Sequence, residues 1–246
     1  MDAVLVAANW KMYKTAAHAQ AYFRAWDTRC VPEGREAAFF PSFTLLPVVG
    51  KLLPSGQHLG AQNCHEGEEG AFTGEVSSAM LADAGCRYVL VGHSERRHVF
   101  GESDERIAAK FASARRHGLR PVLCVGEKLE EREAGRTLGV VLGQLEADLG
   151  SAPPAGGFDV AYEPVWAIGT GKVARPEDAA EVHQSILAWL RQRGAGQDAR
   201  VLYGGSVKPD NAAVLLNTPG VQGLLVGGAS LDPAAFAAIV RAGLSA

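Results

Sequence analysis

The stretch Asp159-Val-Ala-Tyr-Glu-Pro164, together with the segment from Pro176 to Gly194, contains one complete structural unit of this chain. Its first four residues form a short, mostly apolar run that is closed by a polar residue and a proline. Such a run is typical of a strand buried on both faces of a sheet. Pro176-Glu-Asp178 is a helix start signal, and Gly194 is a stop signal. The unit is therefore a strand followed by a helix.

The same unit recurs along the whole chain. Helical stretches, such as the one that Ser103 opens and Gly118 closes, separate the apolar runs. Dividing 246 residues by eight gives about 31 residues per unit, enough for one strand and its crossover helix. No linker or change of composition divides the chain, so residues 1–246 are predicted to form a single (β/α)8 barrel, an α/β fold. The other seven runs are Val4–Ala8, Ala37–Phe40, His58–Ala61, Tyr88–Val91, Pro121–Val125, Arg200–Tyr203 and Gly223–Val226.

An open, doubly wound sheet is the alternative, because alternating strands and helices alone do not distinguish it from a closed barrel. Its usual G-x-G-x-x-G fingerprint does not follow the first strand, where the chain reads Ala8-Asn-Trp-Lys11. Gly171-Lys172 does not complete a nucleotide phosphate loop either. Trp166 occupies the place of the first glycine, and Val173 that of the magnesium-binding Ser or Thr. Nucleotide chemistry is therefore disfavoured.

The composition is that of an ordinary globular protein, with 47% hydrophobic residues, 21% charged residues and a net charge of −3. This excludes a disordered chain, a coiled coil and a collagen. The basic residues are dispersed, so we expect no nucleic acid partner. No apolar run reaches membrane-spanning length, and Val4–Ala8 is too short for a signal peptide. We therefore expect no membrane association and a cytoplasmic location.

The four cysteines are far apart in the sequence and form no C-x-x-C pair. This pattern indicates neither a zinc site nor a disulfide framework. We expect buried free thiols and no metal. The cysteines are Cys30, Cys64, Cys86 and Cys124.

In a (β/α)8 barrel the reacting groups lie at the C-terminal ends of the strands, so the residues after each apolar run are the candidates for chemistry. Five of these ends supply a cation, an imidazole, a carboxylate and two glycine-rich turns. They carry Asn9 and Lys11, His93 to Glu95, Glu163, Gly204-Gly-Ser206, and Gly227-Gly228.

Glu163 is the candidate general base. The following Pro164 favours an extended backbone and leaves the carboxylate at the strand end. A solvated surface glutamate is the alternative. The loop after it contains several glycines but also Trp166 and Ile168, which are poorly placed in water unless they cover something. This composition indicates a lid over a site.

His93 lies between a strand and an expected helix start, where the positive end of the helix disfavours the imidazolium form. A neutral imidazole can donate one hydrogen bond to a developing oxyanion. Lys11 can hold a substrate anion at the end of the first strand. The alternatives are a structural histidine and a surface charge.

The glycine pairs after the seventh and eighth strands lie where barrel enzymes often bind phosphate through backbone N–H groups. Either pair alone is an ordinary tight turn, but both at adjacent strands favour phosphate binding. We expect a small phosphate ester as the ligand.

Several motifs of this chain resemble those of the triosephosphate isomerase family, occur in the family's order and cover essentially the whole chain. The resemblance implies a TIM barrel. The motifs are Asn9-Trp-Lys-Met12, Gly60-Ala-Gln-Asn63, Gly70-Ala-Phe-Thr-Gly-Glu-Val-Ser77, Gly92-His-Ser-Glu-Arg-Arg97, Ala161-Tyr-Glu-Pro-Val-Trp-Ala-Ile-Gly-Thr-Gly-Lys172, Tyr203-Gly-Gly-Ser-Val207 and Leu225-Val-Gly-Gly-Ala-Ser-Leu231.

The resemblance implies interconversion of dihydroxyacetone phosphate and glyceraldehyde 3-phosphate through an enediol or enediolate, in glycolysis and gluconeogenesis, with no cofactor and no metal. Glu163 would transfer the proton between neighbouring carbons, and neutral His93 would polarise the carbonyl. Lys11 would offset the charge of the phosphate and of the oxyanion. Asn9 would help to position the substrate, and Glu95 would support the site from behind.

The family's phosphate-binding backbone positions correspond to Gly169, Ser206, Gly227 and Gly228. By the same resemblance, the Tyr203 hydroxyl would bond the backbone near Ala174 when the lid closes and excludes water.

The segment from Asn63 to Thr73 resembles the family's projecting loop. The resemblance implies that Thr73 reaches the catalytic region of a second subunit. We therefore expect a C2 homodimer.

Two positions depart from the family together. Leu187 and Gln222 stand where the family usually has an arginine and an aspartate that form an ion pair. Replacing both members leaves no stranded charge, so we expect a repacked scaffold and retained activity.

Two other functions compete with this interpretation. One is a different phosphate-binding barrel isomerase, for example one that acts on a phosphoribosyl-linked amine. The other is a phosphosugar sensor without catalysis. The joint presence of Lys11, His93, Glu163 and the expected lid disfavours both.

Overall fold

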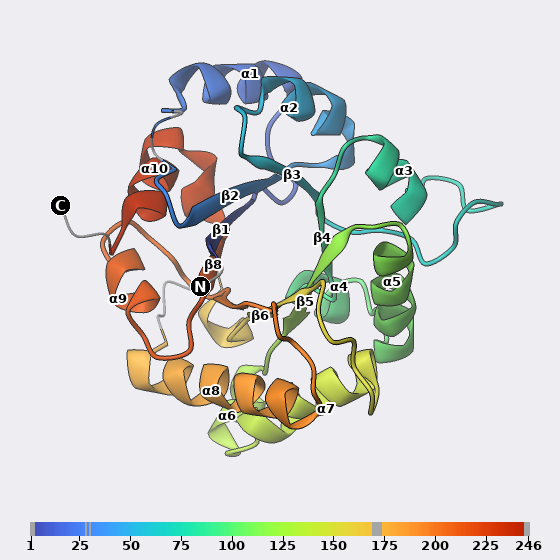
Figure 1. Cartoon of the computed structure of the whole chain (residues 1–246), viewed down its shortest axis with the longest axis vertical. Helices are drawn as coiled ribbons and strands as arrows, with labels where there is room; N and C mark the ends of the chain where they lie inside the picture. Colours follow the sequence, from blue (N-terminus) through green and yellow to red (C-terminus); the bar gives the residue numbers. More distant parts are fainter. Residues whose placement is uncertain (1–2, 28, 30, 169–173, 244–246) are drawn as a thin grey trace.

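The computed structural model describes residues 3–27, 29, 31–168 and 174–243. Eight parallel strands form a closed barrel in chain order, in which each strand pairs with the next and β8 pairs with β1 (Figure 1). This confirms the predicted (β/α)8 TIM barrel and excludes the open, doubly wound sheet. The strands are β1 (Val4–Asn9), β2 (Arg35–Phe40), β3 (His58–Ala61), β4 (Tyr88–Val91), β5 (Arg120–Val125), β6 (Asp159–Tyr162), β7 (Val201–Tyr203) and β8 (Gly223–Val226).

The strand boundaries agree with the apolar runs to within two residues. Four strands, β3, β4, β6 and β8, coincide with the predicted runs. β1 extends one residue further, to Asn9, and β7 begins one residue later, at Val201, while β2 and β5 begin earlier, at a charged residue. β2 begins at Arg35, whose guanidinium donates to the Ala242 carbonyl at 2.7 Å, and β5 begins at Arg120, which donates to Asp159 Oδ2 at 2.8 Å.

The helices lie outside the barrel and cover its outer face (Figure 1). Ser103 caps α5 by accepting the Arg106 N–H, and Pro176 is the first residue of α8. The α-helices are α1 (Ala16–Ala25), α2 (Leu46–Leu52), α3 (Ser78–Asp83), α4 (Ser94–His98), α5 (Asp104–Arg116), α6 (Leu129–Glu133), α7 (Thr137–Leu149), α8 (Pro176–Gln192), α9 (Ala212–Leu216) and α10 (Pro233–Arg241). Short 3-10 helices follow β2, β6 and β8; they are η2 (Phe43–Leu45), η3 (Val165–Ala167) and η4 (Gly228–Leu231).

An ionic network closes the N-terminal end of the barrel. Arg200 donates to Glu36 Oε2 at 2.6 Å and to Asp159 Oδ2 at 2.8 Å, and the Tyr88 hydroxyl donates to Glu36 Oε1 at 2.5 Å. These groups are almost completely buried. Because side chains fill this end, a site is expected at the C-terminal end, as is usual for this fold.

One loop leaves the body of the barrel. It follows β3 and runs from His65 to Ser77, and these two residues form an isolated β-bridge at its base. The loop projects beyond α3 and α5 (Figure 1). Phe72 and Thr73 on it are exposed.

In the part of the chain that the structure describes, no helix is both long enough and apolar enough to cross a membrane. Within the same residues, no three His, Cys, Asp or Glu side chains are grouped as a metal site would require. Cys64, Cys86 and Cys124 are buried free thiols, and Cys30 lies outside the described residues.

Candidate active site

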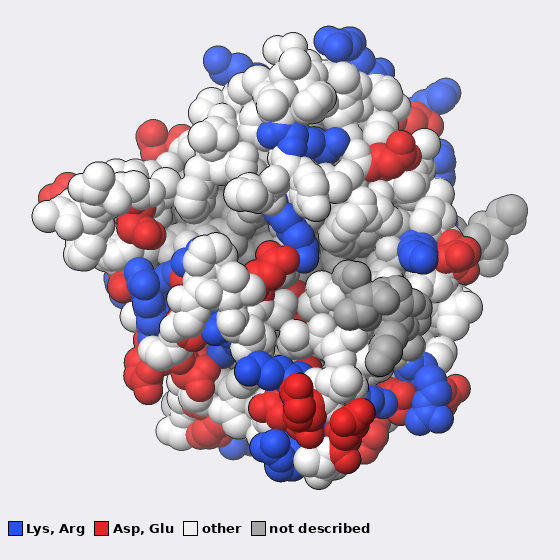
Figure 2. All heavy atoms as spheres, turned by 180° about the vertical axis from the view of Figure 1, so that it is seen from behind, with Lys and Arg blue, Asp and Glu red and all other residues white. Residues whose placement is uncertain are grey.

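A cavity of about 530 Å³ lies at the C-terminal end of the barrel. Figure 2 shows this face of the molecule, which is hollowed near its centre. The cavity brings together the residues predicted from the ends of β1, β4, β6, β7 and β8. Those that line it are Asn9, Lys11, His93, Glu163, Ile168, Ser206, Gly227 and Gly228, with Gly204 and Gly205.

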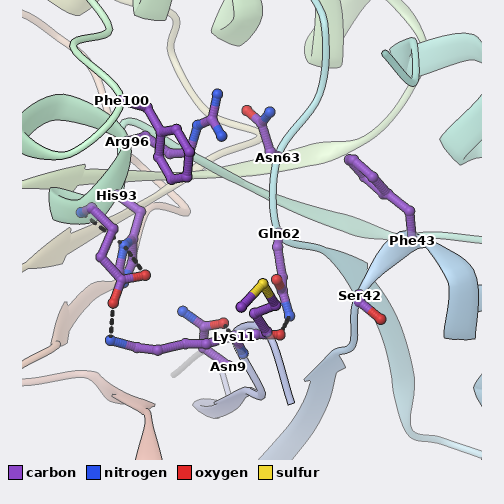
Figure 3. A pocket seen from close by; sticks show the side chains of 11 residues that line it. Asn9, Lys11, Ser42, Phe43, Gln62, Asn63, His93, Arg96 and Phe100 are labelled. Atoms are coloured by element: carbon purple, nitrogen blue, oxygen red, sulfur yellow. Dashed lines mark hydrogen bonds and ion pairs between the residues drawn. The ribbon is translucent and has the colours of Figure 1, made fainter. Parts of the chain in front are cut away.

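Lys11 is held in place through its backbone and its side chain. Its φ of +50° is unusual for a residue with a Cβ. Its N–H donates to Asn9 Oδ1 at 3.0 Å, and its carbonyl accepts from Gln62 Nε2 at 2.8 Å. Its Nζ donates to Glu95 Oε1 at 2.6 Å. Lys11 thus reaches across the mouth of the barrel toward the residues beside His93 (Figure 3).

His93 is the N-cap residue of α4, and this position fixes its protonation. Its Nδ1 accepts the backbone N–H of Glu95 at 3.2 Å. Because a backbone N–H only donates, Nδ1 carries no proton. This contact places a ring proton on Nε2. Nε2 lies 3.0 Å from Glu163 Oε1 and donates to it.

Glu163 is a buried carboxylate with two hydrogen-bond donors. Its side chain is 2% exposed, and Oε2 accepts the Ser94 N–H at 2.8 Å. Burial raises the pKa of Glu163, but His93, the Ser94 N–H and the Lys11 charge together lower it below its ordinary value. The carboxylate is therefore ionised at neutral pH and is ready to accept a proton.

A family model described as triosephosphate isomerase matches residues 4–243 of the chain. The chain belongs to the triosephosphate isomerase family. The triosephosphate isomerase of Aquifex aeolicus is 52% identical over 242 residues, which cover 96% of this chain and 98% of the relative. That of Thermus thermophilus is 48% identical over 247 residues, 98% of this chain and 99% of the relative. As a member of the triosephosphate isomerase family, the chain is an intramolecular aldose–ketose isomerase.

Three of the four positions that the sequence predicts to bind phosphate lie in the cavity. Ser206 follows β7, and Gly227 and Gly228 follow β8. A Cβ at Gly227 would meet Lys11 Cε at 3.6 Å, so the lysine side chain runs beside this turn. Gly169, the fourth position, lies outside the described residues.

The residues predicted to form a lid lie near the cavity. Trp166 Nε1 donates to Glu127 Oε1 at 2.9 Å, and Ile168 lines the cavity. Burial raises the pKa of Tyr203 to about 12. The nearby Ala174 backbone partly offsets this increase, because it lowers the same pKa. The structure gives the Tyr203 hydroxyl no hydrogen-bond partner among the described residues.

A second, smaller cavity of about 240 Å³ adjoins the first and shares Asn9, Lys11 and His93 with it (Figure 3). Glu95 and Phe100 also line it, and the Phe100 side chain is 65% exposed. Thr73 on the projecting loop is exposed. The dimer stays a prediction.

Leu187 and Gln222, which the sequence resemblance singles out as a paired departure, have uncharged contacts. Leu187 is partly buried and packs against the hydrophobic core. Gln222 Oε1 accepts the Val201 N–H at 3.0 Å. Both contacts are compatible with a repacked scaffold.

Sequence reasoning missed the end of β5. A Cβ at Gly126 would lie 1.7 Å from the Glu163 carbonyl oxygen, so only glycine allows the two strand ends to approach this closely. The next residue, Glu127, is fully buried and accepts hydrogen bonds from Trp166 and, at 3.2 Å, from the Tyr162 hydroxyl. The position directly after an apolar run is the signal that could have identified both residues.

Proposed function

We propose that the chain interconverts dihydroxyacetone phosphate and glyceraldehyde 3-phosphate through an enediol or enediolate intermediate. The observation that best supports this proposal is the contact between His93 and Glu163. A neutral imidazole presents its only N–H to an ionised, buried carboxylate, with Nε2 and Oε1 3.0 Å apart. This pair supplies a hydrogen-bond donor for a carbonyl oxygen and a base for the carbon beside it.

Substrate binding requires an exchange of hydrogen-bond partners. The substrate carbonyl oxygen takes the place of Glu163 Oε1 as the acceptor of the His93 Nε2–H. The carboxylate then leaves the Ser94 N–H, which Oε2 accepts at 2.8 Å, and approaches the carbon that carries the proton. Glu163 removes this proton and becomes neutral, while the electrons of the broken C–H bond leave the carbonyl oxygen as an oxyanion. The proton of the neighbouring hydroxyl passes to this oxygen, and Glu163 returns its own proton to the former carbonyl carbon, so that the neighbouring carbon becomes the new carbonyl.

The developing oxyanion needs nearby positive charge. Lys11 supplies it, since its Nζ is held by Glu95 at 2.6 Å and its side chain runs beside Gly227. Asn9 keeps the Lys11 backbone in place through the 3.0 Å bond to its N–H. The backbone N–H groups of Ser206, Gly227 and Gly228 bind the phosphate, with Gly169 completing the set.

Trp166, Ile168 and Tyr203 belong to a lid that excludes water and protects the enediolate from losing its phosphate. The contact of Trp166 with Glu127 supports this assignment, because it anchors one end of the lid to the rim beyond β5.

A second copy of the chain completes the site in this proposal. The cavity in Figure 3 is open and contains Lys11, His93 and Glu95, and the projecting loop that carries Thr73 suits such a cavity in a C2 homodimer. We assign the enzyme to glycolysis and gluconeogenesis in the cytoplasm, and we expect that it requires no metal and no cofactor.

The experiment is the coupled steady-state rate of glyceraldehyde 3-phosphate isomerisation with excess chelator, with Glu163→Gln as the variant. A high rate that the chelator leaves unchanged and the variant abolishes supports the proposal. A folded dimer with no rate above background overturns it and favours a phosphate-binding protein without catalysis.

A further inference from the structure

Ser230 lies three residues beyond Gly227 and is fully buried. Its Oγ donates to the Gly227 carbonyl at 2.7 Å, and its own N–H donates to the same oxygen at 2.9 Å. A buried hydroxyl thus adds a second donor to an oxygen that the backbone already satisfies. Its effect is to fix the direction of that carbonyl.

The fixed carbonyl also fixes an N–H group. The peptide bond between Gly227 and Gly228 is trans, so its oxygen and its N–H point in opposite directions. With the Gly227 oxygen tied to Ser230, the Gly228 N–H is turned away from Ser230. Gly228 lines the cavity, so its donor is available there to an anion before any ligand arrives.

Asn211 holds the other glycine-rich turn by bonding it on both sides of Val207. It occupies the N-cap position of α9, but its side chain does not cap this helix. Instead Nδ2 donates to the Ser206 carbonyl at 3.0 Å, and Oδ1 accepts the Lys208 N–H at 2.8 Å. The side chain that would ordinarily stabilise α9 thus closes the turn after β7.

We propose that Ser230 and Asn211 are positioning residues of the phosphate site, which preorganise the backbone N–H groups of the two turns. The inference rests on the proposed function, because it assigns the phosphate to those turns. Neither side chain contacts the substrate. Each acts through a carbonyl, of Gly227 or of Ser206.

The test uses Ser230→Ala and Asn211→Asp, with Ser113→Ala as the matched control. Ser113 is also fully buried, but it lies on the outer helix α5. Ser230→Ala should raise the KM for glyceraldehyde 3-phosphate and the inhibition constant of inorganic phosphate about fivefold, the net effect of one lost hydrogen bond. Asn211→Asp should have a similar or larger effect, because it places an acceptor against the Ser206 carbonyl.

Unphosphorylated glyceraldehyde separates positioning from general damage. Its deuterium exchange, followed by NMR, should be unchanged in Ser230→Ala and Asn211→Asp, since it does not use the phosphate turns. Ser113→Ala should change none of these values. Equal losses with and without phosphate, or an unchanged KM in both variants, overturn the inference. If Ser230→Ala does not fold, the inference is tested with Asn211→Asp alone, because Asn211 is only half-buried.

The same series distinguishes a failure of the proposed function from a failure of the inference. A wild-type protein without isomerase activity contradicts the proposed function. Calorimetric titration with inorganic phosphate then still tests the two side chains. Binding that is weaker in both variants supports their role, and binding of equal strength overturns it.

Discussion

A single methyl group added at Gly126 should displace the proposed base. The added Cβ would lie 1.7 Å from the Glu163 carbonyl oxygen, whereas real Cβ atoms essentially never approach closer than 3.0 Å. Gly126 has little freedom to move away, because its N–H donates to Gln144 Oε1 at 2.8 Å and its carbonyl accepts from Gln144 Nε2 at 3.2 Å. In Gly126→Ala, Glu163 must therefore shift.

The two distances set the size of the effect. Relief of the clash requires a movement of at least 1.3 Å, which is the difference between the 3.0 Å limit for a Cβ contact and the 1.7 Å separation in the variant. A misplacement of about 1 Å at a reacting group lowers a rate by about 100-fold. We expect kcat to fall by at least that factor. KM should change little, because Ser206, Gly227 and Gly228 follow other strands.

The assay is steady-state isomerisation with separate kcat and KM values, alongside thermal unfolding. Gly143→Ala is the matched control. Gly143 lies on α7 with open space around its added Cβ, so this variant should keep its activity and gain up to about 1 kcal/mol of helix stability. A folded Gly126→Ala protein with the wild-type kcat would refute the reasoning.

Three further predictions concern stability and assembly. Burial lowers the pKa of His183 from 6.5 to about 4, so the unfolded chain binds this proton first as the pH falls. The free energy of unfolding should therefore decrease by about 3 kcal/mol per subunit between pH 6.5 and 4. Urea titrations of His183→Gln should show a shallower pH slope, and an equal slope would contradict this. Gln222→Asp alone should lower the free energy of unfolding, measured by thermal unfolding, by about 1–3 kcal/mol, because the shorter side chain draws its acceptor back from the Val201 N–H and adds an unpaired charge. Adding Leu187→Arg should restore most of this loss, and a strongly stabilising single aspartate would argue against the repacked scaffold. Thr73→Asp should lower activity together with the dimer mass in light scattering, and full activity in a proven monomer would disprove the partner's contribution.

The strands are predictable from the sequence because each is an apolar run buried on both faces. What the sequence does not reveal is where a charged residue joins a strand. Arg35 belongs to β2 because its guanidinium reaches the Ala242 carbonyl near the other end of the chain, 207 residues away. No local pattern contains this contact.

The candidate site is predictable to a similar extent. The fold predicts reacting groups at the C-terminal ends of the strands, and this is where Glu163, His93 and Lys11 lie. Their hydrogen-bond partners are not predictable in this way. The Ser94 N–H that holds Glu163 is a backbone group without a side-chain signal, and Gln62 acts on Lys11 across 51 residues.

The central claim is that Glu163 carries the proton between two neighbouring carbons. The most direct measurement follows the isomerisation of glyceraldehyde 3-phosphate in D2O by NMR, for the wild-type protein and for Glu163→Gln. We expect deuterium on the reacting carbons with the wild-type protein, and almost no isomerisation or exchange with the variant. Deuterium incorporation by Glu163→Gln at the wild-type rate would contradict it.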